Sequence, residues 1–394
     1  MERDSVIRLV LLLLPLILFG PLGIDIYLPA IPSMASQFAA STKDIQVSLS
    51  VFILALGLGQ PFFGPLADNY GRRPVALTAT LLFLLGALLA VQAQSVSALL
   101  LGRLIQGLGA CAASVVVFAV VRDRLSGNDC VRAYCYLNGT LCLAPALAPL
   151  LGAGLTLSLG WQANFLFLAL FALLTLLLCL RQLHESRPAH TLRQPLLCTR
   201  PYCELWRYGA FRAYGIACLA AMGTMLTYVT LAPMVLMEQM GLNETEFALV
   251  FAGNAGLIMA TSFTVPRLSR QLERHRVAEL GTGLLLAGGA AMLFGVQAGL
   301  GVAGFMLPMA LCSVGFSLTL GAASASAMAP FADRAGRAAA LLGCLQMAGA
   351  AGVSFAASRL PLPAGESCAL AIVLLSGCAL LVLQRLPHRQ QCPV

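Results

Sequence analysis

The sequence predicts an all-α polytopic membrane protein in which twelve transmembrane helices form two six-helix halves. Three observations favour this fold class: an apolar composition, twelve apolar stretches of spanning length, and basic residues confined to every second connecting segment. The 394-residue chain is 59% hydrophobic and only 10% charged, and its mean hydropathy is +0.87. Soluble globular chains carry about 25% charged residues. The composition therefore excludes soluble enzymes, disordered proteins and nucleic-acid-binding proteins.

A helix that spans the hydrocarbon core of a membrane needs about 20 predominantly apolar residues. The first stretch that meets this requirement follows Arg3 and Arg8, and so resembles a signal peptide. Its apolar run is longer than a signal-peptide core and leads to Pro29 and Pro32, so we interpret it as a membrane helix. The twelve predicted spans are 6–28, 44–66, 74–94, 97–121, 132–157, 162–181, 210–236, 246–266, 276–297, 300–328, 335–358 and 366–384.

The basic residues predict the orientation of these spans. All but three of the 24 basic residues lie at the ends or in the segments that the alternation places on one side of the membrane. The exceptions are Lys43 and Arg359 on the other side and Arg103 inside a span. Cytoplasmic loops carry an excess of Lys and Arg. We therefore expect both termini in the cytoplasm, and the net charge of +8 reflects topology rather than an acidic ligand.

The longest polar stretch, residues 182–209, falls between the sixth and seventh spans and is rich in arginine and proline. It predicts a cytoplasmic linker between an N-terminal six-helix half, residues 1–181, and a C-terminal half, residues 210–394. Two halves of parallel orientation are typical of transporters that hold their substrate at the interface of the repeats.

Two charged residues, Asp25 and Arg103, lie well inside predicted spans. A charge at the centre of a membrane helix costs about 2.5–3.5 kcal/mol on insertion scales, so such a residue indicates function. At about 1.5 Å per residue, the two lie at similar depths below the same membrane surface. We expect either a titrating carboxylate biased by a nearby arginine or a static ion pair that fixes helix packing.

The segment between the second and third spans has an unusual combination of residues, Gly64-Pro65-Leu66-Ala67-Asp68-Asn69-Tyr70-Gly71-Arg72-Arg73. We expect Gly64 at a helix end, Gly71 in a tight turn, and Asp68 as an acceptor for a neighbouring helix N-terminus. This segment resembles the loop motif of the major facilitator superfamily. The resemblance implies the twelve-helix fold of that family and a role for the loop in conformational gating.

Further segments extend the resemblance over essentially the whole chain. Gly102 to Gly107 is similar to the arginine motif of the fourth helix, which implies a role for Arg103 in proton transfer. Ala144 to Gly152, with Pro145, Pro149 and Gly152, is similar to the antiporter motif of the fifth helix, with alanines in place of its usual glycines. The segments 23–32, 121–123 and 160–165 resemble the Bcr/CflA branch of drug exporters, chloramphenicol and multidrug exporters among them. A relative in that branch has a second acid in its first helix, which this chain lacks, and this implies mostly uncharged substrates.

A second copy of the A-D-x-x-G-R spacing runs from Ala332 to Arg337, at the start of the eleventh span. Its distance from the first copy does not match the offset of the two halves. We expect Arg337 and this helix N-terminus to face Asp68, and Asp123 to steady Arg72. Chance in an arginine-rich turn is the alternative.

The sequence offers weaker candidates for a substrate cavity in Tyr27, Asn138, Met222 and Tyr228. An amide such as Asn138 serves as often in pinning helices together, and packing or lipid contact is the more common role of residues such as Met222 and Tyr228. The 13 cysteines follow no metal-site or disulfide spacing, the four histidines are expected in charged connecting segments, and no phosphate-binding loop is present. We therefore expect no cofactor, metal or nucleotide.

Together with these observations, the resemblance implies a monomeric, proton-coupled antiporter in the bacterial inner membrane that exports small, mostly uncharged amphipathic drugs such as phenicol-like compounds. Its partners are the drug, protons and the lipid bilayer, with no nucleic acid. The alternative is a proton-coupled symporter that imports a nutrient such as a nucleoside or a sugar. Neither function is enzymatic.

Overall fold

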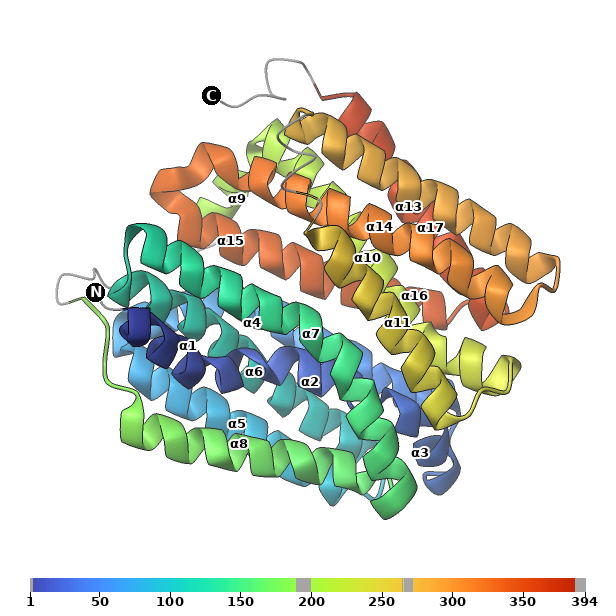
Figure 1. The fold of residues 1–394 in the computed structure, drawn as a ribbon, viewed down its shortest axis with the longest axis horizontal. Coiled ribbons are helices and arrows are strands. Elements are labelled where there is room, and N and C mark those ends of the chain that lie inside the picture. The colour runs from blue at the N-terminus through green and yellow to red at the C-terminus, as the bar shows by residue number, and fades with distance from the viewer. Residues whose placement is uncertain (1–2, 189–199, 264, 266–271, 387–394) are drawn as a thin grey trace. The chain divides into compact units, whose positions relative to one another are not determined.

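The computed structural model describes residues 3–188, 200–263, 265 and 272–386 (Figure 1). The chain divides into two compact units, Met1–Leu197 and Cys198–Val394, called unit 1 and unit 2 below. This division falls inside the predicted linker 182–209. Residues 189–199 of that segment lie outside the described part of the chain, so its cytoplasmic location stays a prediction.

The regular secondary structure among the described residues of unit 1 is entirely helical. In chain order its elements are α1 (Arg3–Ile17), α2 (Phe19–Asp25), the 3₁₀ turn η1 (Leu28–Ala30), α3 (Ile31–Gln37), α4 (Thr42–Tyr70), α5 (Arg72–Val91), α6 (Val96–Arg124), α7 (Gly127–Leu159) and α8 (Gln162–Gln182).

The first span is longer and less regular than predicted. It runs from Val6 to Gln37 rather than from 6 to 28, and it is broken into α1, α2, η1 and α3. The 3₁₀ turn begins directly before Pro29, and α3 begins directly before Pro32. Proline lacks the backbone donor of a continuous helix but fits the first turn of a new one. The two prolines therefore restart the helix instead of ending the span.

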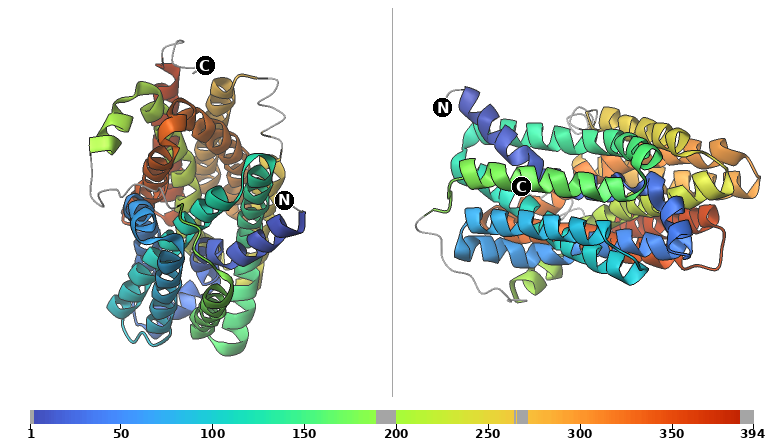
Figure 2. Two further views of the ribbon diagram at one scale, coloured as in Figure 1. Left: turned by 90° about the vertical axis from the view of Figure 1, so that its left-hand side faces the viewer. Right: turned by 90° about the horizontal axis from the view of Figure 1, so that it is seen from below.

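Within unit 1, α4, α5, α6 and α8 run alongside one another (Figures 1 and 2). The backbones of α5 and α6 touch: a Cβ atom added to Gly86 would lie 2.6 Å from the carbonyl oxygen of Gly102. Phe19 of α2 stacks on Phe83 of α5 with ring centroids 4.2 Å apart. Small residues thus let α5 and α6 approach closely, and the Phe19–Phe83 stack packs α2 against α5.

The regular secondary structure among the described residues of unit 2 is also helical. Its elements are α9 (Arg200–Arg207), α10 (Gly209–Ala232), the π-helical turn η2 (Pro233–Gln239), α11 (Glu244–Ser262), α13 (Arg274–Gln297), α14 (Gly301–Met328), the 3₁₀ turn η3 (Ala329–Arg334), α15 (Ala335–Cys344), the π-helical turn η4 (Leu345–Gly349), α16 (Ala350–Ser358) and α17 (Ala364–Gln384). Figure 1 shows α13 packed beside α14 and α17.

Hydroxyl and amide groups join the helices of unit 2. Ser313 of α14 donates a 2.8 Å hydrogen bond to Oδ1 of Asn254 in α11. His275 lies in the first turn of α13 and is buried, with Nδ1 3.2 Å from the Tyr214 hydroxyl and Nε2 3.3 Å from Glu279. The expectation that every histidine lies in a connecting segment is therefore wrong for His275, because α13 begins at Arg274.

Eleven segments of the described chain are long and apolar enough to cross a membrane. The remaining predicted span, 246–266, corresponds to α11, which ends close to residues outside the described part. Both α4 and α11 begin with a capping box, formed by Ser41 with Asp44 and by Asn243 with Glu246. Asp44 and Glu246 thus act as helix-starting residues at the ends of these two helices.

Candidate functional site

Arg103 is completely buried in α6 and bonds the backbone of α2. Its Nη2 donates a 2.7 Å hydrogen bond to the carbonyl oxygen of Gly23, and its Nη1 donates a 2.7 Å bond to Oε1 of Gln106. Gly23 has no room for a side chain, because an added Cβ would lie 2.6 Å from the Phe52 ring. The arginine therefore connects α6 directly to the α2 main chain.

Aromatic rings surround the Arg103 guanidinium. Its central carbon lies 4.2 Å from the ring centre of Phe52, 4.7 Å from that of Tyr27 and 5.9 Å from that of Phe165. Tyr27 is fully buried, and its hydroxyl is 3.0 Å from Ser48 Oγ. Cation–π contacts are strongest where the cation is shielded from water. Tyr27, predicted to line a cavity, thus helps to hold a buried charge in this structure.

Asp25 is the last residue of α2 and is 3% exposed. No described residue donates a hydrogen bond to its carboxylate or forms an ion pair with it. Arg103 instead bonds Gly23, two residues earlier. The sequence places the two charges at one depth, and the structure brings Arg103 to the backbone of the Asp25 helix without pairing their side chains. A role for Asp25 in proton coupling stays a prediction.

The predicted antiporter motif, which lies in α7, contacts the backbone that directly follows Asp25. Pro145 and Pro149 lie inside α7 without ending it. A Cβ atom at Gly152 would overlap the carbonyl oxygen of Ile26, the residue after Asp25. Glycine at position 152 is therefore required for the approach of α7 to the end of α2. Arg103 and Gly152 thus contact the backbone before and after Asp25, at Gly23 and at Ile26.

The turn between α4 and α5 is organised by Arg72, whose side chain is 2% exposed. Its Nη1 lies 2.9 Å from Asp68 Oδ1 and donates a 2.7 Å hydrogen bond to the Ala67 carbonyl, and its Nε lies 2.8 Å from Asp123 Oδ2 in α6. The predicted contact of Asp123 with Arg72 is present. Gly71 has a φ of +106°, which glycine adopts readily. The expectation that Gly64 ends a helix is wrong, because α4 continues to Tyr70.

Glu185, which follows α8, is a site residue that the sequence analysis missed. Its carboxylate accepts hydrogen bonds from the backbone N–H groups of Arg72 at 2.8 Å and Arg73 at 3.1 Å, the first residues of α5, and from those of Ser186 and Arg187. Partial burial opposes ionisation, but these four donors outweigh it and hold the pKa of Glu185 below its ordinary value. The sequence does contain a signal for this residue: Glu185 is an acid in an arginine-rich segment that directly follows a span.

The segment around Glu185 is bonded to the same turn at several further points. Arg187 Nη1 donates to the Asn69 carbonyl at 2.9 Å, and Arg73 Nη2 donates to the Leu180 carbonyl at 3.1 Å. Arg124, at the end of α6, donates to the His184 carbonyl at 2.9 Å. Residues 183–187 thus connect the end of α8 to the α4–α5 turn.

The other predicted site residues are not gathered around Asp25. Arg337 is an exposed residue of α15 in unit 2, and its predicted approach to Asp68 joins the two units and stays a prediction. Tyr228 is buried and stacks on Phe251 at 5.6 Å, which is a packing role, and Met222 is partly buried in α10. The side chain of Asn138 lies outside the described residues.

A sequence profile described as Major Facilitator Superfamily matches residues 13–354. The chain belongs to the major facilitator superfamily. It is therefore a multi-pass membrane transporter of small molecules and not an enzyme, and the predicted twelve-helix fold class is confirmed.

Two relatives narrow the position of this transporter in its family. The multidrug resistance protein MdtL of Salmonella paratyphi A is 32% identical over 342 residues, which cover 87% of this chain and 86% of the relative. The protein of the same name from Shewanella oneidensis is 32% identical over 335 residues, or 84% of each chain. The predicted resemblance to multidrug-resistance proteins of this family is confirmed.

Two solved structures share the fold of this transporter. The D-xylose–proton symporter superposes with a TM-score of 0.77 at 15% identity, covering 100% of both chains. The human organic anion transporter MFSD10 superposes with a TM-score of 0.73 at 18% identity, covering 98% of this chain and 100% of that structure. At these identities the likeness concerns the fold alone.

Proposed function

We propose that this transporter is a proton-coupled antiporter that exports small, mostly uncharged amphipathic drugs, phenicol-like compounds among them, across the bacterial inner membrane. The observation that carries the proposal is Asp25, an acid inside a span that has no partner among the described residues. A charge at membrane depth is retained where it has a function. The names of the MdtL relatives support drugs as the substrate class.

Proton binding at Asp25 has a clear physical role in this scheme. A proton entering from outside neutralises the carboxylate and promotes drug release, and its loss to the cytoplasm restores the charged form. Arg103 and Gly152 hold the adjoining backbone at Gly23 and Ile26, so the change in charge acts on a fixed segment. One proton crossing a potential of 100 mV supplies about 2.3 kcal/mol, enough for roughly a 50-fold gradient of a neutral drug.

The proposal includes the orientation and the gate. Both termini and the α4–α5 turn lie in the cytoplasm, as the distribution of basic residues favours. Arg72, with Asp68 and Asp123, forms the cytoplasmic gate, together with Gly64, Gly71 and Arg73 of the same loop and Arg337 of unit 2. The protein acts as a monomer.

Proton flux in inverted membrane vesicles distinguishes export from import. Chloramphenicol and other uncharged drugs are added outside vesicles that carry no imposed pH gradient, and the pH inside is followed with a fluorescent dye. An antiporter exchanges entering drug for protons, so the lumen becomes alkaline. A symporter would carry protons in with its substrate and acidify the lumen, which would contradict the proposal.

Asp25→Asn tests the assignment of the proton site. We expect drug-dependent proton flux to fall at least about tenfold because the amide cannot exchange a proton, while drug binding changes by less than about threefold. Asp129→Asn, which removes an acid paired with Arg132 at 3.7 Å at the start of α7, is the control and should retain flux. Full proton flux in an Asp25→Asn variant that inserts normally would show that the coupling residue lies elsewhere.

A further inference from the structure

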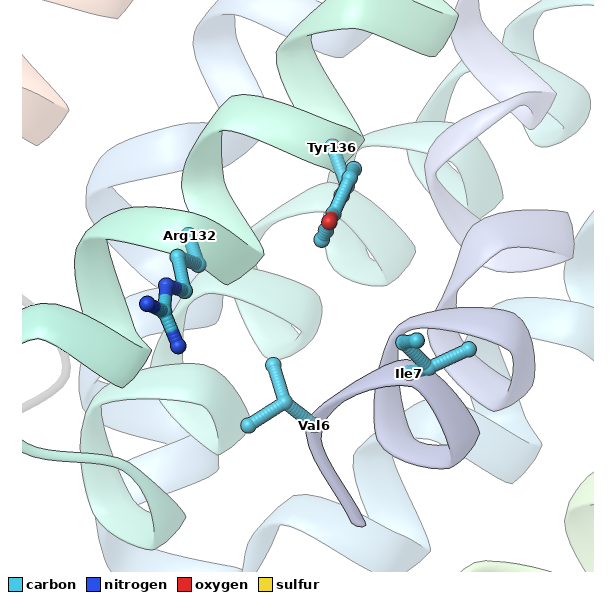
Figure 3. Close-up of a pocket in the computed structure, with 4 residues that line it drawn as sticks. All are labelled: Val6, Ile7, Arg132 and Tyr136. Atoms are coloured by element: carbon cyan, nitrogen blue, oxygen red, sulfur yellow. The ribbon is translucent and has the colours of Figure 1, made fainter. Parts of the chain in front are cut away.

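A pocket of about 260 Å³ lies between α1 and α7 in unit 1, apart from the residues that surround Asp25 (Figure 3). It is lined by Val6 and Ile7 of α1 and by Arg132 and Tyr136 of α7. Figure 3 shows the arginine and the tyrosine projecting from successive turns of α7 on the side that faces Val6. None of the predicted gate, coupling or cavity residues is among these four.

The lining of this pocket is amphipathic. The Arg132 side chain is 61% exposed, and its contact with Asp129 at 3.7 Å is its one interaction with a described residue. That contact uses Nη1 at long range, so the rest of the guanidinium can donate to a ligand. The Tyr136 hydroxyl also makes no hydrogen bond to a described residue. Val6 and Ile7 supply aliphatic surface beside these two polar groups.

Exposed apolar side chains continue from the pocket along both helices. On α1, Leu11 lies one turn beyond Ile7, and both are exposed. On α7, Leu143 and Leu147 lie two and three turns beyond Tyr136 on the same face, and both are exposed. Residues four or seven apart share a face of a helix. The pocket therefore opens onto apolar surface that a hydrocarbon chain can cover.

The pocket lies at the boundary between the polar and apolar parts of the chain. The helix α1 begins at Arg3 and α7 begins at Gly127, so Val6 and Arg132 lie within the first two turns of their helices. Arginine and tyrosine at the ends of spans lie at the level of lipid headgroups. Basic pockets between membrane helices are suited to anionic headgroups.

We propose that this pocket binds the headgroup of an anionic phospholipid. Its phosphate accepts hydrogen bonds from Arg132 and Tyr136, and its acyl chains lie along Ile7 and Leu11 of α1 and Leu143 and Leu147 of α7. The aliphatic half of the lining and the exposed leucines favour a lipid over free phosphate. A cation in the lining favours an anionic lipid over a zwitterionic one.

Lipid binding to the full-length protein tests this proposal. The purified transporter in detergent is titrated with phosphatidylglycerol or with phosphatidylcholine of the same acyl chains, and bound lipid is counted by native mass spectrometry. We expect phosphatidylglycerol to bind more tightly, and Arg132→Gln to weaken it about fivefold, as loss of one cation at a membrane surface does. Tyr136→Phe should weaken it by a smaller factor.

Arg181→Gln is the matched control, because Arg181 is an exposed arginine in the last turn of α8, at the same end of unit 1 and outside the pocket. It should leave phosphatidylglycerol binding within about twofold of the unchanged protein. An equal loss from Arg181→Gln would show a general charge effect and overturn the proposal. Displacement of the lipid by millimolar phosphate would assign the pocket to a free anion, and displacement by chloramphenicol would assign it to substrate. If Arg132→Gln does not fold, wild-type affinity in Tyr136→Phe overturns the proposal.

Discussion

The third and fourth membrane helices of each unit cross with their backbones in contact, but the polar groups beside the two crossings differ. In unit 1 a Cβ atom at Gly86 of α5 would lie 2.6 Å from the backbone of α6, and in unit 2 one at Gly281 of α13 would lie 2.6 Å from the backbone of α14. Beside the first crossing α6 buries Arg103, whereas α14 buries Ser313, Ser317 and Thr319.

This difference extends to the whole interior of each unit. Among the described residues, the buried Asp and Arg residues all belong to unit 1, namely Asp25, Arg72 and Arg103, and so does Asp123, whose side chain is 6% exposed. Unit 2 buries His275 and a set of hydroxyl and amide groups. The two halves thus share a way of packing helices without sharing their charges. The packing of the helices and the placement of buried charges are therefore separable in this fold.

Replacement of Arg103 should have the largest effect on stability. Arg103→Met fills a similar volume but leaves the Gly23 carbonyl and Gln106 Oε1 without their donor, and each buried unsatisfied group costs about 1–3 kcal/mol. We expect the free energy of unfolding of the purified protein in detergent to fall by about 3 kcal/mol, with loss of transport. Ser313→Ala, which removes one neutral bond in α14, should cost about 1 kcal/mol. Equal losses would remove the distinction between a charged and a neutral interior.

Gly152→Ala tests whether the contact next to Asp25 controls transport. The added methyl group overlaps the Ile26 carbonyl, so the end of α2 must move, and we expect transport to fall about tenfold because misplacement of a reacting group is costly. Gly154→Ala, two residues along the same helix, meets no atom within 4 Å and should transport normally. The measurement is the initial rate of drug uptake into inverted vesicles. Similar rates in both variants would show that Gly152 contributes to helix packing without controlling transport.

Alanine at the two glycine crossings tests the feature that the units share. Gly86→Ala and Gly281→Ala each place a methyl group against a neighbouring backbone, and overpacking of this kind costs about 1–3 kcal/mol. Gly283→Ala, on α13 with open space around it, should be neutral or stabilising by up to about 1 kcal/mol. Thermal unfolding of the three proteins checks this. A strong effect in one unit alone would mean that the crossings are not equivalent.

Glu185→Gln should have a small effect on stability that depends on pH. Because backbone donors lower the pKa of Glu185 from its ordinary value of 4.5, its stabilising effect is full above that value and is lost as the pH falls through the lowered pKa. For an exposed carboxylate we expect about 1 kcal/mol at pH 7, disappearing on acidification below pH 4.5.

Glu204→Gln is the control for this pH dependence. Glu204 contacts Arg334 at 3.6 Å, and both side chains are about half exposed. Exposed ion pairs contribute about 0–1 kcal/mol. Melting curves of the two variants and the unchanged protein between pH 3.5 and 7 provide the comparison. A difference between Glu185→Gln and the unchanged protein that does not decrease as the pH falls from 7 to 3.5 would contradict the role of the ionised carboxylate.

Much of the fold could be predicted because long apolar runs are a strong signal in sequence. The spans 97–121 and 162–181, for example, correspond to α6 and α8 within three residues at either end. The breaks in the first span could not be predicted, because a proline such as Pro29 or Pro32 can either end a helix or lie in the first turn of the next one. The π-helical turns η2 and η4 have no comparable sequence signal, since the shift from i−4 to i−5 bonding depends on local strain.

The site was predictable in its residues but not in its contacts. Asp25, Arg103 and Arg72 stand out because charges are costly near or inside a span. The partner of Arg103 could not be inferred, because a backbone carbonyl has no identity in the sequence and the aromatic rings around it come from three separate spans. Glu185 was overlooked because the segment after α8 was interpreted through its arginines alone.

The choice of a main-chain acceptor by Arg103 has a consequence for how sequences of this kind diverge. A side-chain partner can be lost by one substitution, and a compensating change at the arginine then follows. The Gly23 carbonyl is present whatever residue occupies that position. Positions 25 and 103 should therefore vary independently among relatives that keep this geometry. Correlated changes should instead join position 103 to the aromatic positions 27, 52 and 165, whose rings shield the guanidinium from solvent.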